Sequence, residues 1–135
     1  MQITTKGRYA INAMLDLSLE YNNKPITLSV ISERQNISLS YLEQLFTKLR
    51  RNNLVKSIRG PGGGYMLNKL PEDISIVDII EAVDENVDLR RCKGASNCNG
   101  GKRCISHVLW CDLSSQMRSF LKSINLKELI DKGNK

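Results

Sequence analysis

The chain has no long apolar run and no leader-like start. No stretch of its 135 residues approaches the roughly 20 apolar residues of a membrane-spanning helix, and the opening MQITTKGRYA lacks a signal-peptide core. The sequence also offers no flavin or nicotinamide motif and no Gly-Lys-Ser/Thr phosphate loop. These absences argue against a membrane protein, a phosphate-loop protein and a flavin- or nicotinamide-dependent enzyme. We expect a cytoplasmic protein whose thiols stay reduced.

Histidine and cysteine are scarce and occur in one place. The single histidine and all four cysteines lie in RRCKGASNCNGGKRCISHVLWC, residues 90–111, with the spacing Cys92-x5-Cys98-x5-Cys104-x2-His107-x3-Cys111. In a reducing compartment, clustered cysteines indicate metal or redox chemistry more readily than disulfides. The segment is otherwise rich in glycine, asparagine and basic residues, a composition that rarely packs into a core. We therefore expect these thiols to hold a metal group.

The positive charge is uneven. Of the net charge of +6, residues 1–60 contribute +5 (nine Lys+Arg against four Asp+Glu) and residues 61–135 contribute +1 (eleven against ten). A basic first half suggests a polyanionic partner for that half, although a solvated basic surface would look the same.

The first half has the pattern of three helices followed by a hairpin. Side chains able to cap a helix precede each predicted helix: Thr4 or Thr5, Thr27, and Ser38 or Ser40. Residues 54–58 alternate like a strand, GPGGG at 60–64 must turn, and residues 65–67 return. We predict a mainly α fold with a small β-hairpin wing, in one winged helix-turn-helix domain over residues 1–135. The helix-turn-helix lies at about 28–51 and the wing at about 54–69.

A long helix is predicted after the cysteine loop (92–107), from about residue 104 to 123. At about 100° per residue, Cys104, His107 and Cys111 would project from one face of it. An apolar stripe falls on roughly the opposite side: Leu109, Leu113, Met117, Phe120 and Ile124. This stripe makes the helix a candidate dimerisation helix that packs against a twin.

The third predicted helix carries the candidate DNA contacts, because the second helix of such a pair lies in the major groove. Side chains outside its apolar face, with the residue that precedes it, are Ser38, Ser40, Tyr41, Glu43, Gln44 and Lys48. Gln44 can form two hydrogen bonds with adenine, and Glu43 can accept from cytosine N4 and penalise other bases. In a plainer interpretation, Glu43 is the N3 member of a capping box that starts at Ser40. Both interpretations stay open.

The hairpin turn carries a second group of candidate contacts. Glycines such as Gly60 and Gly62 let a backbone approach phosphates closely, and Arg59 beside them can enter a narrow minor groove. A hairpin without a ligand is the alternative.

The ligand types suit either zinc or an iron–sulfur cluster. Zinc knuckles bring cysteines two to four residues apart, and no such pair is present here. Basic neighbours would lower thiol pKa values and offset ligand charge. Cys111 is either a reserve ligand or a small, partly buried apolar residue, and the second role is the more ordinary one.

Several segments together resemble the iron–sulfur cluster regulators of the Rrf-type winged helix-turn-helix family of bacterial transcription factors. They are TKGRYA at 5–10, ISERQNISLSYLEQLF at 31–46, SIRGPGGGY at 57–65, AVDE at 82–85 and the Cys-x5-Cys-x5-Cys-x2-His loop. Two features depart from the pattern: Cys111 is an additional cysteine, and Arg8 stands where nitric-oxide-sensing relatives look to have an acidic residue.

The resemblance implies a homodimer with the long helix in its interface and one [2Fe-2S] cluster on each protomer. The implied ligands are Cys92, Cys98, Cys104 and His107, and the implied DNA-reading positions include Ser40, Glu43, Gln44 and Arg59. It also implies repression of cluster-assembly genes when loaded, activity at other promoters without the cluster, and cluster-assembly scaffold proteins as partners. A winged-helix regulator with structural zinc and a cluster-carrying redox protein are the alternatives.

Overall fold

The computed structural model describes residues 5–19, 24–84, 95–97 and 99–133. Its elements are, in order, α1 (Thr5–Leu19), α2 (Leu28–Gln35), α3 (Leu39–Arg51), β1 (Val55–Ile58), β2 (Gly64–Leu67), the 3-10 turn η1 (Pro71–Asp73), α4 (Ile76–Ala82), α5 (His107–Lys122) and α6 (Leu126–Gly133). This is the predicted mainly α fold with a β-hairpin.

Helix α1 is the centre of the body and contacts α2, α3, α4, α6 and β2. Its fully buried side chains include Ala10, Ala13 and Met14, spaced at helical intervals along one face. They pack with apolar side chains from every neighbouring element: Ile31, Leu42, Leu45, Phe46, Leu49, Leu67, Ile79, Ile80 and Leu126. One continuous apolar core therefore holds the helix-turn-helix, the hairpin, α4 and α6 together.

The helix-turn-helix is defined by its caps. The Thr27 hydroxyl accepts from Val30 N at 3.3 Å at the start of α2, and Asn36 ends α2 in the left-handed conformation, with φ of 54°. At the end of α2, Arg34 and Gln35 both donate to the buried Asp16 of α1, at 3.0 and 2.8 Å. These bonds fix the orientation of α2, and so of the turn into α3, on the body.

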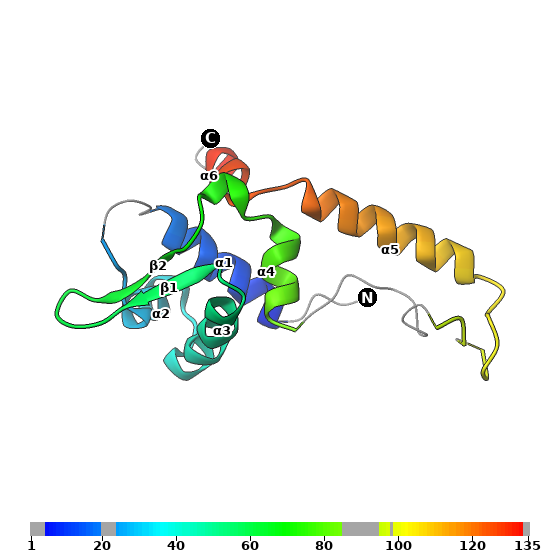
Figure 1. Ribbon diagram of the computed structural model, residues 1–135, viewed down its shortest axis with the longest axis horizontal. Helices are drawn as coiled ribbons and strands as arrows, with labels where there is room; N and C mark the ends of the chain where they lie inside the picture. The colour runs from blue at the N-terminus through cyan, green and yellow to red at the C-terminus, as the bar shows by residue number, and fades with distance from the viewer. Residues whose placement is uncertain (1–4, 20–23, 85–94, 98, 134–135) are drawn as a thin grey trace.

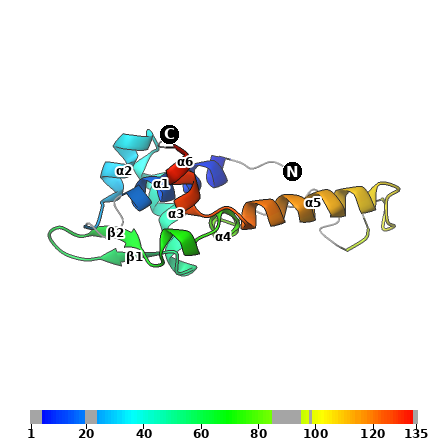
Figure 2. The same cartoon turned by 90° about the horizontal axis from the view of Figure 1, so that it is seen from above.

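The wing is a two-stranded antiparallel hairpin in which Val55 pairs with Leu67 and Ile58 pairs with Gly64. A β-bridge of two backbone hydrogen bonds, at 3.0 and 2.7 Å, joins Tyr65 to Ile26 just before α2. The Tyr65 ring packs against Phe46 of α3, with 4.9 Å between ring centroids. The hairpin is thus tied to α3 and to the segment just before α2, and its turn extends from the body (Figures 1 and 2).

Helices α4 and α6 both begin with side-chain caps. Ser75 and Asp78 form a reciprocal capping box at 3.0 and 3.1 Å, and Glu128 N donates to Asn125 Oδ1 at 2.9 Å. Two backbone hydrogen bonds, Ile76 N to Ile124 O and Leu126 N to Ile74 O, bind the start of α6 to the start of α4. These bonds anchor the C-terminal end of α5, which directly precedes α6 in the chain.

Helix α5 leaves the body as an arm (Figures 1 and 2). Its last turns pack on the core through Met117 and Leu121, and Arg118 bridges to Glu81 of α4 at 2.8 Å. Its first turns extend beyond the body and carry exposed apolar side chains. No helix within the described ranges is both long and apolar enough to cross a bilayer.

Candidate functional site

Helix α3 divides into a buried face and an exposed face. Leu42, Leu45, Phe46 and Leu49 are buried. On the other side Ser40, Glu43 and Gln44 are exposed, as is Ser38 before the helix. With wing residues 59–63, these side chains form what we call the α3–wing surface. Since α3 and β1 are in contact, the hairpin that carries the wing turn is attached to the body next to α3.

Ser38, and not Ser40, caps α3. The Ser38 hydroxyl accepts from Tyr41 N at 3.3 Å, so Leu39 is the first helical residue and Glu43 the fifth. The capping box of Ser40 with Glu43, considered from the sequence, is therefore wrong. Ser40 and Glu43 both point out of α3 without a role in its cap, which leaves their side chains available to a partner.

Tyr41 and Lys48 are half-buried at the edge of this surface. The Tyr41 ring makes an edge-to-face contact with Tyr9 of α1, at 5.7 Å between ring centroids. The ammonium of Lys48 lies 2.8 Å from a carboxylate oxygen of Asp84. The sequence places both side chains with the DNA contacts, and the structure adds contacts to the body that position them.

The wing turn presents backbone more than side chains. Gly60 and Gly62 have φ of 95° and 75°, a conformation that disfavours other residues, and a Cβ at either position would meet nothing within 4 Å. Gly63 N donates to Gly60 O at 2.9 Å and closes the turn. Arg59, the first residue after β1, is exposed. The turn can therefore approach a surface closely, with a guanidinium at its start.

Basic residues surround this surface. The last turn of α3 carries Lys48, Arg50 and Arg51, and the wing carries Lys56 and Arg59. An exposed helix with polar side chains beside a cationic wing is the arrangement with which winged helices bind a nucleic-acid duplex.

Two of the four predicted metal ligands lie within the described residues. His107 is the first residue of α5 and is only 6% exposed, and its backbone N–H donates to the carbonyl of Cys104 at 3.1 Å. Cys92 and Cys98 lie outside the described residues. Within the described ranges no group of three or more His, Cys, Asp or Glu side chains lies close enough to hold a metal.

Cys104 is not on the long helix, contrary to the sequence prediction. Helix α5 begins at His107 with Ser106 as its N-cap residue, so Cys104 lies in the preceding turn. His107 and Cys111 are one helical turn apart, and Cys111 Sγ lies 3.3 Å from His107 Nε2. The Ser106 hydroxyl accepts from Trp110 Nε1 at 2.8 Å and lies 3.9 Å from Cys104 Sγ. The sequence interpretation did not include Ser106.

The donor set at this end of α5 fits an iron–sulfur cluster. Thiolate and imidazole are ligands of such clusters, and a helix N-terminus favours the negative charge that a thiolate-bound cluster carries. Lys102 and Arg103, both exposed, add positive charge next to Cys104. Asn99 and Lys102 pair through two backbone hydrogen bonds, at 2.7 and 3.0 Å, in a tight turn over Gly100-Gly101.

The predicted apolar stripe of α5 splits in two. Met117 and Ile124 pack against the core of the body. Leu109, Leu113 and Phe120 are exposed, and Phe120 retains 64% of its surface. Val108 and Trp110 are exposed beside them. Exposed apolar side chains gathered on one projecting helix indicate a protein–protein contact.

Comparison with known proteins identifies the family to which this chain is similar. The sequence profile of the Rrf2 family, described as iron-dependent transcriptional regulators, matches residues 3–132. The HTH-type transcriptional regulator IscR of Photorhabdus laumondii is 56% identical over 131 residues, which are 97% of this chain and 80% of that protein. IscR of Erwinia tasmaniensis is 55% identical over 131 residues, 97% of this chain and 79% of that protein.

Solved structures share the fold. CymR, the global cysteine regulator of B. subtilis, has a TM-score of 0.85 at 32% identity over 98% of both chains. T. potens IscR has a TM-score of 0.80 at 33% identity and covers 98% of this chain and 88% of its own. One of these regulators is named for cysteine, so the fold alone does not identify the signal. The residues of the cysteine segment must do so.

Proposed function

Because the chain belongs to the Rrf2 family of iron-dependent transcriptional regulators, we propose that it senses an iron–sulfur cluster and adjusts its DNA binding accordingly. Like its relatives, the chain is a DNA-binding regulator of transcription and not an enzyme. Beyond this, we propose the cluster, its ligands, the individual DNA contacts and the dimer.

We assign the α3–wing surface to operator recognition. Helix α3 enters the major groove, where Ser40 and Gln44 read base edges and Glu43 accepts from cytosine while repelling phosphates at mispositioned sites. Ser38 and Tyr41 lie at the start of α3, and Lys48 lies on its flank, near the backbone of the duplex. Arg59, with the open backbone at Gly60 and Gly62, contacts phosphates and the minor groove.

The cluster assignment is carried by one observation: His107 is buried at the N-terminus of α5 and is bonded through its backbone to Cys104. We propose Cys92, Cys98, Cys104 and His107 as the ligands of one [2Fe-2S] cluster per protomer. When bound, the cluster supplies a redox-active group whose presence follows the supply of iron and sulfide. A neutral imidazole is a more replaceable ligand than a thiolate, which suits a sensor.

We propose that the functional unit is a homodimer. The exposed apolar residues of α5 become buried if two such helices pack together, and two copies of α3 can then read two half-sites. In this unit the loaded protein represses genes for cluster assembly, and the protein without cluster acts at other promoters. Cluster-assembly scaffold proteins are the expected source of the cluster.

One experiment tests the proposal. The protein is purified without oxygen, its visible absorption spectrum is recorded, and loaded and stripped samples are titrated with the DNA upstream of its own gene. We expect sulfide-to-iron charge-transfer absorption and a different affinity or site preference for the two samples. Colourless protein with stoichiometric zinc would show that the site holds a structural metal in place of a cluster. Equal DNA binding by both samples would refute sensing.

A further inference from the structure

An ion pair joins the flank of α3 to the residue that leaves α4. Lys48 Nζ lies 2.8 Å from Asp84 Oδ2, with Lys48 33% and Asp84 69% exposed. Lys48 is on the third turn of α3, next to the side chains assigned to DNA, and Asp84 is two residues beyond the end of α4. The pair therefore connects the DNA-reading helix to the chain that follows α4.

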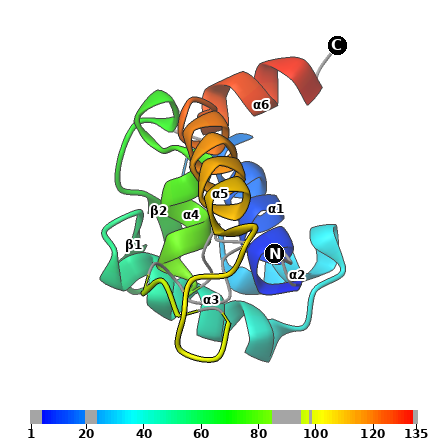
Figure 3. The ribbon, with the colours of Figure 1, turned by 90° about the vertical axis from the view of Figure 1, so that its right-hand side faces the viewer.

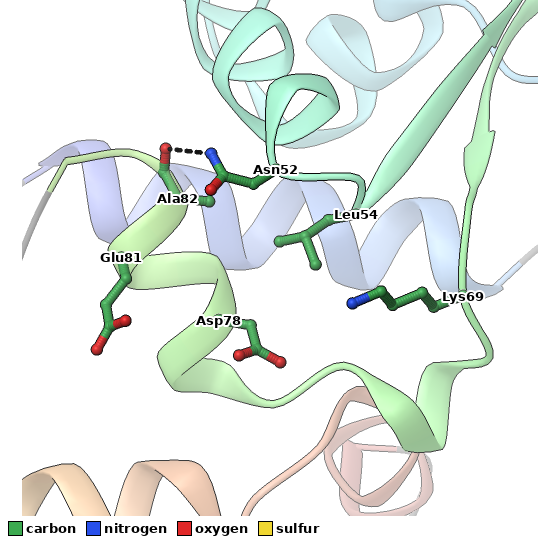
Figure 4. Close-up of a pocket in the computed structure, with 6 residues that line it drawn as sticks. All are labelled: Asn52, Leu54, Lys69, Asp78, Glu81 and Ala82. Atoms are coloured by element: carbon green, nitrogen blue, oxygen red, sulfur yellow. Dashed lines mark hydrogen bonds between the residues drawn. The ribbon is translucent and has the colours of Figure 1, made fainter.

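A second contact joins the same two places. Asn52, the C-cap residue of α3, donates from its side chain to Lys48 O at 2.9 Å and, at 3.5 Å, to Ala82 O at the end of α4 (Figure 4). Next to this contact, Asn52, Ala82 and Glu81 help to line a pocket of about 140 Å³. The ends of α3 and α4 are thus held together by side chains and not by an apolar contact alone.

Asp84 is held in an uncommon backbone conformation. Its φ of 65° lies in the left-handed region, which a non-glycine residue occupies only when its surroundings hold it there. The ion pair with Lys48 and the contact of Asn52 with Ala82 are part of those surroundings.

Three cations act on the Asp84 carboxylate. The hydrogen bond and charge of Lys48, followed by Lys6 and Arg51, hold the pKa of Asp84 below its ordinary value in spite of opposing desolvation. The group is therefore ionised at neutral pH and competes with DNA phosphates for the same cations. An ammonium engaged by a carboxylate releases fewer counterions from DNA than an unengaged one.

We propose that Asp84 is an affinity-determining residue, which holds the Lys48 ammonium back from the DNA backbone. The proposal rests on the proposed function, because it takes Lys48 to lie near the phosphates of the operator. Asp84 acts through Lys48 and contacts no base, so it positions another residue and is not itself a reader of sequence.

The test compares Asp84→Asn with Glu81→Gln in the full chain. Glu81 is a matched control because it is also an acidic residue of this region, is 2.8 Å from its partner Arg118, and points to α5 and not to α3. Binding to the chain's own upstream DNA and to an unrelated duplex is measured by fluorescence anisotropy over a salt series, with all variants at the same iron content. Lys48→Met and the double variant Asp84→Asn/Lys48→Met complete the cycle, and Asp84→Glu keeps the carboxylate.

We expect Asp84→Asn to tighten binding roughly threefold to tenfold and to steepen the salt dependence by about 0.9 for each additional phosphate that a released ammonium neutralises. The tighter binding should disappear when Lys48→Met is added. Asp84→Glu and Glu81→Gln should bind like the parent. Circular-dichroism melting of each variant separates these effects from unfolding.

Three results would overturn the proposal: unchanged or weaker binding by Asp84→Asn, equally tightened binding by Glu81→Gln, or tighter binding by Asp84→Asn that persists when Lys48→Met is added. Failure of the proposed function looks different. In that case the parent shows no preference for its own upstream DNA over an unrelated duplex, whereas a parent that binds specifically and is unaffected by Asp84→Asn contradicts only the role of Asp84.

Discussion

The Sγ atom of Cys111 lies 3.3 Å from Nε2 of His107, one turn along α5. Cys111 is the cysteine that does not belong to the three-cysteine, one-histidine pattern of the loop. Cys111 therefore contacts Nε2, which is one of the two ring nitrogens through which a histidine can bind a metal. Cys111 can therefore orient the imidazole in the protein without metal, and it is also close enough to take its place.

We predict that His107 is the ligand and Cys111 the supporting residue. His107→Ala should remove or strongly destabilise the cluster, whereas Cys111→Ser should keep it with at most about a tenfold loss of affinity, the low end for a residue that orients a ligand. The measurement is visible absorption and iron content after anaerobic reconstitution. Cys111→Ala, which keeps no polar atom, serves as the second variant. Loss of the cluster in the Cys111 variants alone would reverse the assignment.

We predict that Glu43 sets operator discrimination. Because Ser38 caps α3, Glu43→Ala removes no cap, so the melting temperature should change by no more than about 2 °C. The ratio of affinities for two operators that differ at the base under Glu43 should fall by about tenfold, the effect of one good base contact. Competition binding with paired duplexes measures the ratio. Glu72→Ala, an exposed acid on η1, is the control. An unchanged ratio of operator affinities would show that Glu43 is a solvated residue that contacts no base.

Arg59 should contribute affinity without selectivity. Arg59→Ala should weaken binding to all operators by a similar factor, about tenfold, and reduce the salt slope by about one, because one phosphate is no longer neutralised. The physical reason is that a guanidinium on the wing contacts the DNA backbone and is sensitive to the width of the minor groove. It does not bind one particular base pair. Lys132→Ala on α6 is the control, since α6 and α3 lie on opposite sides of the body in Figures 1 and 3. Equal affinity for the parent and Arg59→Ala would refute a contact between the wing and DNA through Arg59.

Local features of the sequence predict the local structure well. Thr27, Ser75 with Asp78, and Asn125 with Glu128 are caps that depend on residues only three apart, and all three are present. The choice between Ser38 and Ser40 was not predictable, because both precede an apolar run at a suitable distance. The predicted start of α5 is three residues early for a similar reason: helical spacing continues through a turn that is not helical.

Contacts between distant residues could not be predicted from periodicity. Lys48 and Asp84 are 36 positions apart (84 minus 48), and Asp16 meets Arg34 and Gln35 only once α1 and α2 pack. The AVDE segment at 82–85 contributes to the family resemblance, but its aspartate has a physical role only beside α3. Single-sequence patterns specify which residues face a core, and not which charged groups meet across it.

The exposed apolar side chains of α5 predict an oligomeric protein whose assembly depends on that helix. Leu113 and Phe120 are seven residues apart on α5 and both exposed, so they lie on one side and would be buried together against a second α5. An aspartate at Leu113 or Phe120 would place an unpaired charge in that contact. It should raise the dimer dissociation constant by at least about a hundredfold, since an uncompensated buried charge costs several kcal/mol.

Sedimentation equilibrium over a concentration series measures the effect of Leu113→Asp and Phe120→Asp. Leu19→Asp is the control, because Leu19 is an apolar residue that is 60% exposed, close to the 64% of Phe120, but lies at the end of α1 on the body. If the α5 variants become monomers that keep the parent's circular-dichroism melt, DNA affinity should fall steeply, because each half-site then binds one protomer without its neighbour. Variants that remain dimers, or a Leu19→Asp protein that dissociates equally, would place the interface elsewhere on the molecule.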